Sequence, residues 1–330
     1  MRKTYRTMLP ESTNSWHTAS MTTAAGRFAP SPTGDLHLGN LRTALVAWLS
    51  ARSQGLDFIV RMEDLDRVTS SVAFEQAQCE ALTALGIDVD GEVVRQSDRF
   101  HLYAAAIDEL TAQGRTYECF CTRREIREAS SAPQGVEAPE GLYPGTCRTL
   151  STEQRAQFVQ QGRPAALRLR AHEQVIEITD EVRGPVRAAI DDVVLRRNDG
   201  VAAYNLAVVV DDAAQHVAEV VRGDDLLSST PRQVMLQRLL GLPTPRYRHV
   251  PLVLGPDGVR LAKRHGAVTL PQLAERGISA QQVLVMLAAS LGLADEDEPV
   301  TTRDLLSRFD IQRLPREPWV LPPHLQRSVS

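Results

Sequence analysis

The sequence contains almost no lysine. Of its 37 basic residues, only Lys3 and Lys263 are lysine, and the others are arginine. The two types are not equivalent, because the guanidinium is a rigid planar fork and the ammonium is a compact charge on a flexible stem. Lys3 lies in a polar N-terminal stretch, so the part expected to fold keeps one lysine. Either Lys263 has survived by chance, or it serves a function that arginine cannot.

Cysteine and long apolar runs are also scarce. Four cysteines in 330 residues argue against a disulfide framework and predict a reducing, cytoplasmic location. No apolar run approaches the ~18 residues of a membrane-spanning helix, so we expect no membrane partner. Residues 1–25 are polar and lack the apolar core of a secretory signal. We expect them to form a disordered extension, within which Met21 is an alternative start.

The sequence has no excess of positive charge. Its formal net charge is −4, whereas nucleic-acid-binding domains are usually basic. The arginines nevertheless occur in close pairs, which form either solvated strand faces or a local basic surface, so RNA binding stays open. The pairs are Arg168 and Arg170, Arg183 and Arg187, Arg196 and Arg197, and Arg246 and Arg248. A length of 330 residues predicts about two domains.

Residues 27–40, with the sequence RFAPSPTGDLHLGN, predict a strand, a tight turn and the start of a helix. From Leu41 the apolar residues recur at helical spacing. Unpaired N–H groups and the helix dipole favour an anion at such a helix N-terminus. His37 adds a polar donor where a phosphate would lie. The alternative is a proline-rich turn with a solvent-facing histidine.

The rest of the chain alternates between predicted strands and helices, which favours an α/β fold with a doubly wound parallel sheet. Glu63 and Arg222 each stand where a buried strand ends, at the edge where such sheets bind ligands. Thr230 is the predicted N-cap of a later helix. Strands are expected at residues 56–62, 166–170, 175–178, 192–196, 203–212 and 218–226, and helices at 72–85, 99–113, 281–291 and 302–309.

Three cysteines are spaced as metal ligands. Cys119 and Cys121 are close enough to share one ion, and Cys147 supplies a third thiolate if the intervening loop folds back. Three soft ligands suit Zn²⁺, which normally takes four in a structural site. The alternative is three unliganded cytosolic thiols. Cys79 falls in a helical pattern and is expected to pack in a core.

Together these motifs resemble the class I aminoacyl-tRNA synthetases, specifically their glutamate branch. Residues 27–40 resemble the first signature of that class, and Arg260-Leu-Ala-Lys263-Arg264 resembles the second. The second departs from the family pattern in two places, with Arg260 for a lysine and Ala262 for a serine. The resemblance covers residues 26–267 and implies a Rossmann-type catalytic domain with an inserted zinc-containing α/β subdomain and a short C-terminal helical segment.

The resemblance also implies the roles of single residues. His37 and Lys263 would be catalytic and stabilise the ATP phosphates. The implied glutamate-binding residues are Arg27, Phe28, Ala29, Pro30, Ser31, Glu63, Tyr204 and Arg222. The implied ATP-binding residues are His37, Gly39, Asn40, Arg260 and Lys263. The implied zinc ligands are Cys119, Cys121, Tyr143 and Cys147.

The implied division is a first catalytic half at residues 26–114, the insertion at 115–205, a second half at 206–265 and helices at 266–330, with no anticodon-binding domain. This organisation is typical of the subfamily that activates L-glutamate with ATP and Mg²⁺ and attaches it to queuosine in tRNA(Asp). A monomer is expected. The alternatives are a truncated enzyme charging the tRNA 3′ end, a small-molecule adenylyltransferase of the same superfamily, and a non-catalytic tRNA-binding relative.

Overall fold

The computed structural model describes residues 23–130, 143–171, 175–261, 268–322 and 325. The predicted N-terminal extension lies almost entirely outside the described residues, and so do Ala262, Lys263 and Arg264 of the second motif. Within the described part of the chain, no helix is long and apolar enough to cross a membrane.

A five-stranded parallel sheet lies at the centre of the fold, in the order β10–β9–β1–β2–β3. The sheet confirms the α/β prediction. Its order reverses between β1 and β9, and ligands bind at such a switch point, outside the carboxyl ends of the strands. The strands are β1 (Ala25–Phe28), β2 (Asp57–Met62), β3 (Val94–Arg95), β9 (Val217–Gly223) and β10 (Arg246–Val250).

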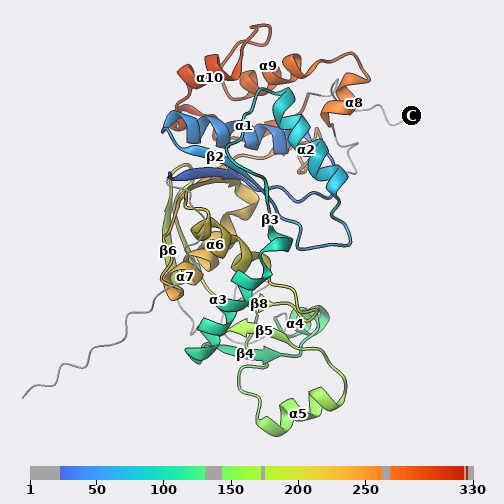
Figure 1. Ribbon diagram of the computed structural model, residues 1–330, viewed down its shortest axis with the longest axis vertical. Coiled ribbons are helices and arrows are strands. Elements are labelled where there is room, and N and C mark those ends of the chain that lie inside the picture. Colours follow the sequence, from blue (N-terminus) through green and yellow to red (C-terminus); the bar gives the residue numbers. More distant parts are fainter. Residues whose placement is uncertain (1–22, 131–142, 172–174, 262–267, 323–324, 326–330) are drawn as a thin grey trace, which may run out of the picture.

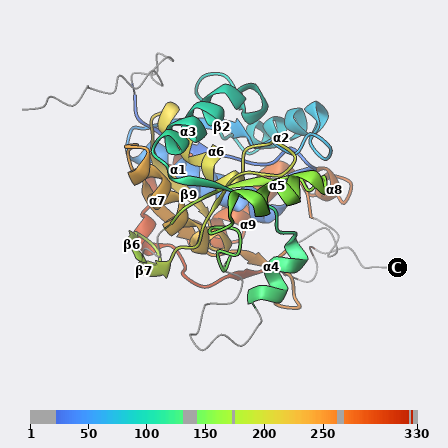
Figure 2. The ribbon, with the colours of Figure 1, turned by 90° about the horizontal axis from the view of Figure 1, so that it is seen from below.

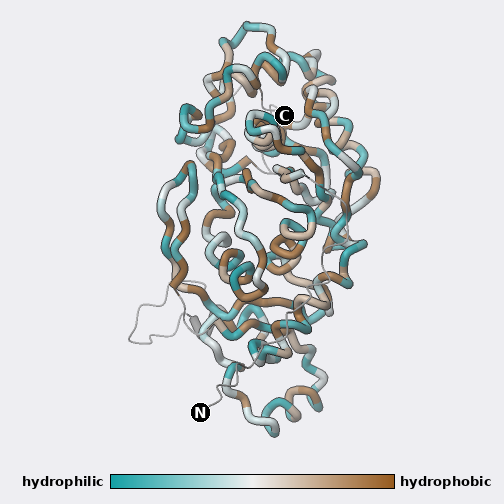
Figure 3. The backbone as a smooth tube through the Cα atoms, turned by 60° about the vertical axis from the view of Figure 1, so that its left-hand side comes forward, coloured by the Kyte–Doolittle hydropathy of each residue, from teal (hydrophilic) through white to brown (hydrophobic). Residues whose placement is uncertain are grey.

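Helices cover both faces of this sheet (Figure 1). An apolar core lies on each face, between the sheet and its helices. Figure 3 shows apolar segments concentrated in the middle of the molecule. One face carries α1 (Leu38–Ser53), α2 (Val72–Ala84), α8 (Leu270–Ala274), α9 (Ala280–Ser290) and α10 (Thr302–Arg308). The other carries α3 (Phe100–Ala112), α6 (Tyr204–Ala214) and α7 (Thr230–Leu239).

Strand β1 and helix α1 pack unusually closely. A Cβ atom placed on Gly26 would lie 2.7 Å from the Cβ of Ala51, nearer than two carbon atoms can approach without a shift. Glycine in β1 therefore lets α1 lie directly against the sheet. This packing fixes the start of α1 close to the carboxyl end of β1.

The segment between α3 and α6 forms a second layer of structure, drawn at the bottom of Figure 1. Its antiparallel sheet has the order β4–β5–β8, and α4 and α5 belong to the same segment. The bounds are β4 (Thr116–Cys119), β5 (Ala166–Leu169), β8 (Val194–Arg196), α4 (Arg123–Ser130) and α5 (Thr152–Gln160).

A hairpin from the same segment reaches back to the central sheet. Strands β6 (Val175–Asp180) and β7 (Gly184–Ala189) form it, and it lies beside α7 in both ribbon views (Figures 1 and 2). Backbone N–H of Glu181 donates to the carbonyl of Tyr247 in β10. The turn of this hairpin is thereby attached to the edge strand of the five-stranded sheet.

Two sequence predictions are wrong in this region of the fold. Residues 203–212 form most of helix α6 and not a strand, because a helix buried on nearly all sides shows the same continuous apolar run. Thr230 is not an N-cap: Ser229 holds that position without a side-chain bond, since the 3-10 helix η2 (Asp224–Ser229) leads directly into α7. The hydroxyl of Thr230 bonds Arg222 instead.

The short elements complete the chain. Strand β11 (Val253–Leu254) pairs with β12 (Trp319–Val320). The sequence did not predict β12. In the part of the chain that the structure describes, the other 3-10 helices are η1 (Gln96–Asp98) and η4 (Ile311–Arg313).

Candidate functional site

A cleft of about 950 Å³ opens at the carboxyl ends of β1, β2 and β9. It is lined by most residues that the sequence singled out: Arg27, Phe28, Ala29, Pro30, His37, Gly39, Asn40, Glu63, Tyr204, Arg222 and Arg260. Ser31 lines a neighbouring cavity of about 900 Å³, which shares Pro30, His37, Asn40 and Arg260 with the first. Lys263 lies outside the described residues.

Two buried arginines define one end of the cleft. Arg27, at 4% exposure, donates from Nη1 to the carbonyl of Val221 at 2.9 Å, and its Nε lies 3.8 Å from Asp212. Burial lowers the pKa of Arg27, and the positive charge of Arg222 adds to the effect. Two guanidinium groups at one end of a cleft form a strong site for a carboxylate.

Among the described residues, the second arginine donates only to neutral partners. Arg222 donates to His249 at 3.0 Å, to Thr230 at 2.8 Å and to Gln233 at 2.8 Å. Its Nη1 is buried and has no hydrogen-bond partner among the described residues. A buried donor without a partner is costly, so a ligand that accepts from Nη1 would be favoured.

Glu63 follows β2 and faces the same cleft. Burial raises its pKa to about 7, despite the opposing charges of Arg61 and Arg27. Arg61 lies 3.7 Å away. A carboxylate at this position can pair with the ammonium group of an amino acid. Burial likewise raises the pKa of the neighbouring Tyr204, which remains a neutral phenol.

A buried ion network beneath the cleft was missed by sequence reasoning. Arg61, with no exposed surface, lies 2.8 Å from Asp212 and 3.8 Å from Asp211. Asp211 accepts from Tyr103 and from Arg99. An arginine inside an apolar strand and two aspartates inside an apolar run were the available signal, because buried charges need partners.

His37 occupies the N-terminus of α1 differently from the prediction. Its Nδ1 accepts from the backbone N–H of Gly39 at 3.0 Å and of Asn40 at 3.2 Å. These two N–H groups are therefore already hydrogen-bonded within the protein and are not available to an anion. Burial lowers the pKa of His37 to about 4, so the imidazole is neutral and carries its proton on Nε2. That N–H is the donor left for a phosphate.

The same end of the cleft carries Arg260. Its guanidinium is 57% exposed and lies 2.5 Å from the carboxylate of Asp225. Because it lines both cavities, Arg260 stands where a long ligand would pass from one to the other.

The predicted metal ligands come together in the second layer of structure. The Sγ atoms of Cys119, Cys121 and Cys147 lie within 4.8 Å of one another. The hydroxyl of Tyr143 lies 3.4 Å from Cys119 Sγ and 3.9 Å from Cys121 Sγ. A tetrahedral ion with Zn–S bonds of ~2.3 Å places its ligands ~3.8 Å apart, so this donor set fits zinc.

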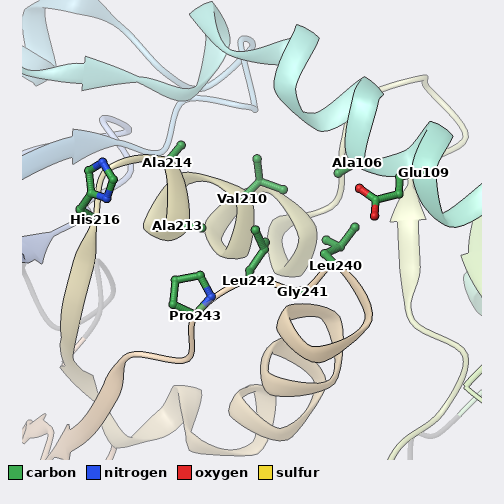
Figure 4. Close-up of a pocket in the computed structure, with 10 residues that line it drawn as sticks. All are labelled: Ala106, Glu109, Val210, Ala213, Ala214, His216, Leu240, Gly241, Leu242 and Pro243. Carbon is green, nitrogen blue, oxygen red and sulfur yellow. The ribbon is translucent and has the colours of Figure 1, made fainter. Parts of the chain in front are cut away.

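Another cavity, of about 650 Å³, lies at the opposite end of the strands (Figure 4). His216, directly before β9, stands at one side of it and Glu109 at another. Its remaining lining is alanine, valine, leucine, glycine and proline. It faces away from the carboxyl ends of the strands, where open α/β sheets bind their ligands.

Comparison with known proteins agrees with this geometry. Residues 24–323 match the family model described as tRNA synthetases class I (E and Q), catalytic domain. A protein of Nocardia farcinica named Glutamyl-Q tRNA(Asp) synthetase is 61% identical, covering 90% of this chain and 93% of that protein. One of the same name from Symbiobacterium thermophilum is 47% identical, covering 92% and 98%. The crystal structure of a glutamate tRNA ligase from Elizabethkingia meningosepticum, in complex with its amino acid, has a TM-score of 0.77 at 28% identity, covering 92% of this chain and 68% of that one.

Proposed function

The chain belongs to the class I tRNA synthetases for glutamate and glutamine, and we propose that it is a ligase acting on glutamate and tRNA(Asp). It activates L-glutamate with ATP to glutamyl-adenylate without needing tRNA. It then transfers the glutamyl group to the queuosine base at the wobble position of tRNA(Asp). The observation that carries this proposal is the name shared by relatives that are 61% and 47% identical over nearly their whole length.

The buried arginines would select the amino acid. Arg27 and Arg222 hold the side-chain carboxylate of glutamate, and Tyr204 contributes its hydroxyl. Glu63 pairs with the α-ammonium group, with Ser31 contributing from its backbone. The orphaned Nη1 of Arg222 supports this assignment, whereas the Ser31 carbonyl already accepts from Gln78 and Thr33.

The other end of the cleft would hold ATP. The Nε2–H of His37 donates to a phosphate, with Gly39, Asn40 and Arg260 around the nucleotide and Lys263 completing the set. The glutamate α-carboxylate attacks the α-phosphorus, and pyrophosphate leaves; Mg²⁺ bound to ATP would supply further positive charge at the phosphates. No side chain acts as a nucleophile. The protein contributes orientation of the reactants and positive charge near the leaving group.

Zinc would be structural and held by Cys119, Cys121, Tyr143 and Cys147. Bound zinc would cross-link Cys121, Tyr143 and Cys147 to Cys119 at the end of β4. We also propose residues 115–205 as an insertion between two catalytic halves, 26–114 and 206–265, followed by a helical segment at 266–330.

The deciding experiment measures ATP–pyrophosphate exchange and transfer of labelled glutamate. We expect exchange with glutamate alone, and transfer to tRNA(Asp) that carries queuosine but not to tRNA(Asp) that lacks it. Exchange that requires tRNA, with label at the tRNA 3′ end, would identify a glutamate-charging enzyme. Exchange without any transfer would indicate a small-molecule adenylyltransferase. The absence of both activities in the wild-type protein would favour the non-catalytic tRNA-binding relative.

A further inference from the structure

A chain of buried side chains leads from Asp180 to Arg222. The carboxylate of Asp180 lies 2.6 Å from Nδ1 of His249, and Nε2 of His249 lies 3.0 Å from Nε of Arg222. His249 is fully buried, Asp180 is 1% exposed and Arg222 is 5% exposed. Asp180 comes from the β6–β7 hairpin, His249 from β10 and Arg222 from β9, so three elements meet at this point.

The donors and acceptors in this chain can run in only one direction. A guanidinium has no acceptor, so Nε2 of His249 must accept from Arg222. The proton of the neutral imidazole is then on Nδ1, and it is donated to Asp180. Backbone N–H groups of Val182 and Arg183 also donate to Asp180, at 3.0 and 2.7 Å. The carboxylate is therefore fixed, and it selects the tautomer of His249.

The neutral imidazole of His249 lies between Asp180 and Arg222, and this has a consequence for the charge of Arg222. A carboxylate in direct contact with the guanidinium would form a bidentate ion pair and compete with any acidic ligand. The imidazole instead orients the guanidinium without a charge of its own. Thr230 and Gln233 bind Nη2 in the same neutral way, and Nη1 is left for the ligand.

We propose that Asp180 and His249 are positioning residues that orient Arg222 toward the side-chain carboxylate of the amino acid while leaving its charge unneutralised. This inference rests on the proposed glutamate-binding role of Arg222. It predicts that the pair controls affinity for glutamate and the preference for glutamate over glutamine, whose neutral amide gains less from a free guanidinium. It predicts little effect on ATP, which lies at the other end of the cleft.

The test compares His249→Leu, His249→Gln and Asp180→Asn in ATP–pyrophosphate exchange. His249→Leu removes the acceptor and should raise the KM for glutamate on the order of 10- to 100-fold, the scale of losing one charge-assisted hydrogen bond. The KM for ATP should change less than about twofold on the same reasoning. His249→Gln should recover most of the affinity, because its amide oxygen can accept from Arg222. Discrimination against glutamine should fall with the affinity for glutamate.

Val250→Ala is the matched control, because Val250 is the next residue of β10 and packs in the core on the other face of the sheet. It should lower the unfolding midpoint without raising the KM for glutamate. Asp180→Asn should also raise the KM for glutamate, because His249 loses the carboxylate that fixes its tautomer, and this variant decides if His249→Leu does not fold. An unchanged glutamate KM in folded His249→Leu or Asp180→Asn, or equal rises for glutamate and ATP, would overturn the inference.

Failure of the underlying function gives a different result. A wild-type protein without exchange activity would refute the proposed function, and an Arg222→Ala variant with normal glutamate KM would refute the role of Arg222. Only an active wild type and an impaired Arg222→Ala, together with unimpaired His249→Leu and Asp180→Asn, would count against the positioning role alone.

Discussion

Glu63 makes the stability of the protein depend on pH near neutrality. Its folded-state pKa of about 7 lies above the ordinary value of 4.5, so the folded state favours the neutral acid. The stabilisation is complete below pH 4.5 and is lost as the pH rises through about 7. Glu63→Gln does not ionise and should therefore gain roughly 1–3 kcal/mol relative to wild type between pH 4.5 and 8. Urea unfolding at several pH values measures this difference. A pH-independent difference would contradict the raised pKa.

His37 combines two roles that substitutions can separate. His37→Ala removes the acceptor for Gly39 and Asn40 and should destabilise α1 by about 1 kcal/mol. It should also reduce pyrophosphate exchange on the order of 10²-fold by removing the Nε2–H donor. His37→Asn retains an N-cap acceptor, so it should restore stability but not exchange. Full exchange by the asparagine variant would show that His37 acts only as a cap.

Single residues also mark the limit of what sequence can predict. The cleft lining was predictable because Arg27, His37 and Glu63 sit in motifs at strand ends. His249 was not, because a histidine inside a strand has no motif. Its importance depends on Asp180, 69 positions away, which only the folded chain brings within hydrogen-bond distance. Arg61, Asp211 and Asp212 did offer a signal, as charges inside apolar runs, but their pairing is also made by the folded chain.

At the scale of elements, the contact between β1 and α1 has little room for a larger side chain. Gly26→Ala would bring its Cβ to 2.7 Å from that of Ala51 and should cost roughly 1–3 kcal/mol through overpacking. The double variant Gly26→Ala with Ala51→Gly should recover part of this loss. Chemical unfolding of the single and double variants measures the coupling. A Gly26→Ala protein as stable as wild type would show that the two elements can move apart freely.

The cysteine cluster should bind one zinc ion per chain. Cys147→Ser should lose the ion, whereas Tyr143→Phe should keep it on three thiolates and release it faster to a chelator. Metal analysis of the purified protein measures the stoichiometry. Cys79→Ser is the matched control, because Cys79 lies in α2 outside the cluster. Wild-type protein without zinc after purification in metal-containing buffer would exclude the site.

Most elements were predictable from periodicity, and α6 shows why others were not. Helices α2, α3, α9 and α10 begin and end within two residues of the predicted bounds. Helix α6 is buried from Leu206 to Asp212, so it has no polar face to reveal a helical period. The hydroxyl of Thr230 accepts a hydrogen bond from Arg222. Because this is a tertiary contact, the sequence alone could not distinguish it from a helix cap.

For the whole molecule, ligand binding should raise the free energy of unfolding. The cleft joins both cores across the sheet, so a ligand that binds only the folded state stabilises the entire chain. A non-hydrolysable glutamyl-adenylate analogue at 100 times its Kd should add about 2.7 kcal/mol. Denaturant unfolding with and without the analogue measures this. Arg222→Ala should remove the gain at the same concentration, and an undiminished gain would place the analogue elsewhere.

The β6–β7 hairpin limits how the protein can be re-engineered. The end of β6 supplies Asp180 to His249, and the turn supplies Glu181 to Arg248, the latter at 2.6 Å. Residues 115–205 therefore cannot be removed as a unit. A shortened protein without them would also lose the hairpin contacts to β10. A graft between relatives would have to carry the hairpin and the edge strand as a matched pair. The antiparallel sheet adds a second constraint, because Leu169 of β5 and Leu195 of β8 lie in the same apolar core as α3 and α6, so a graft would have to preserve this core as well.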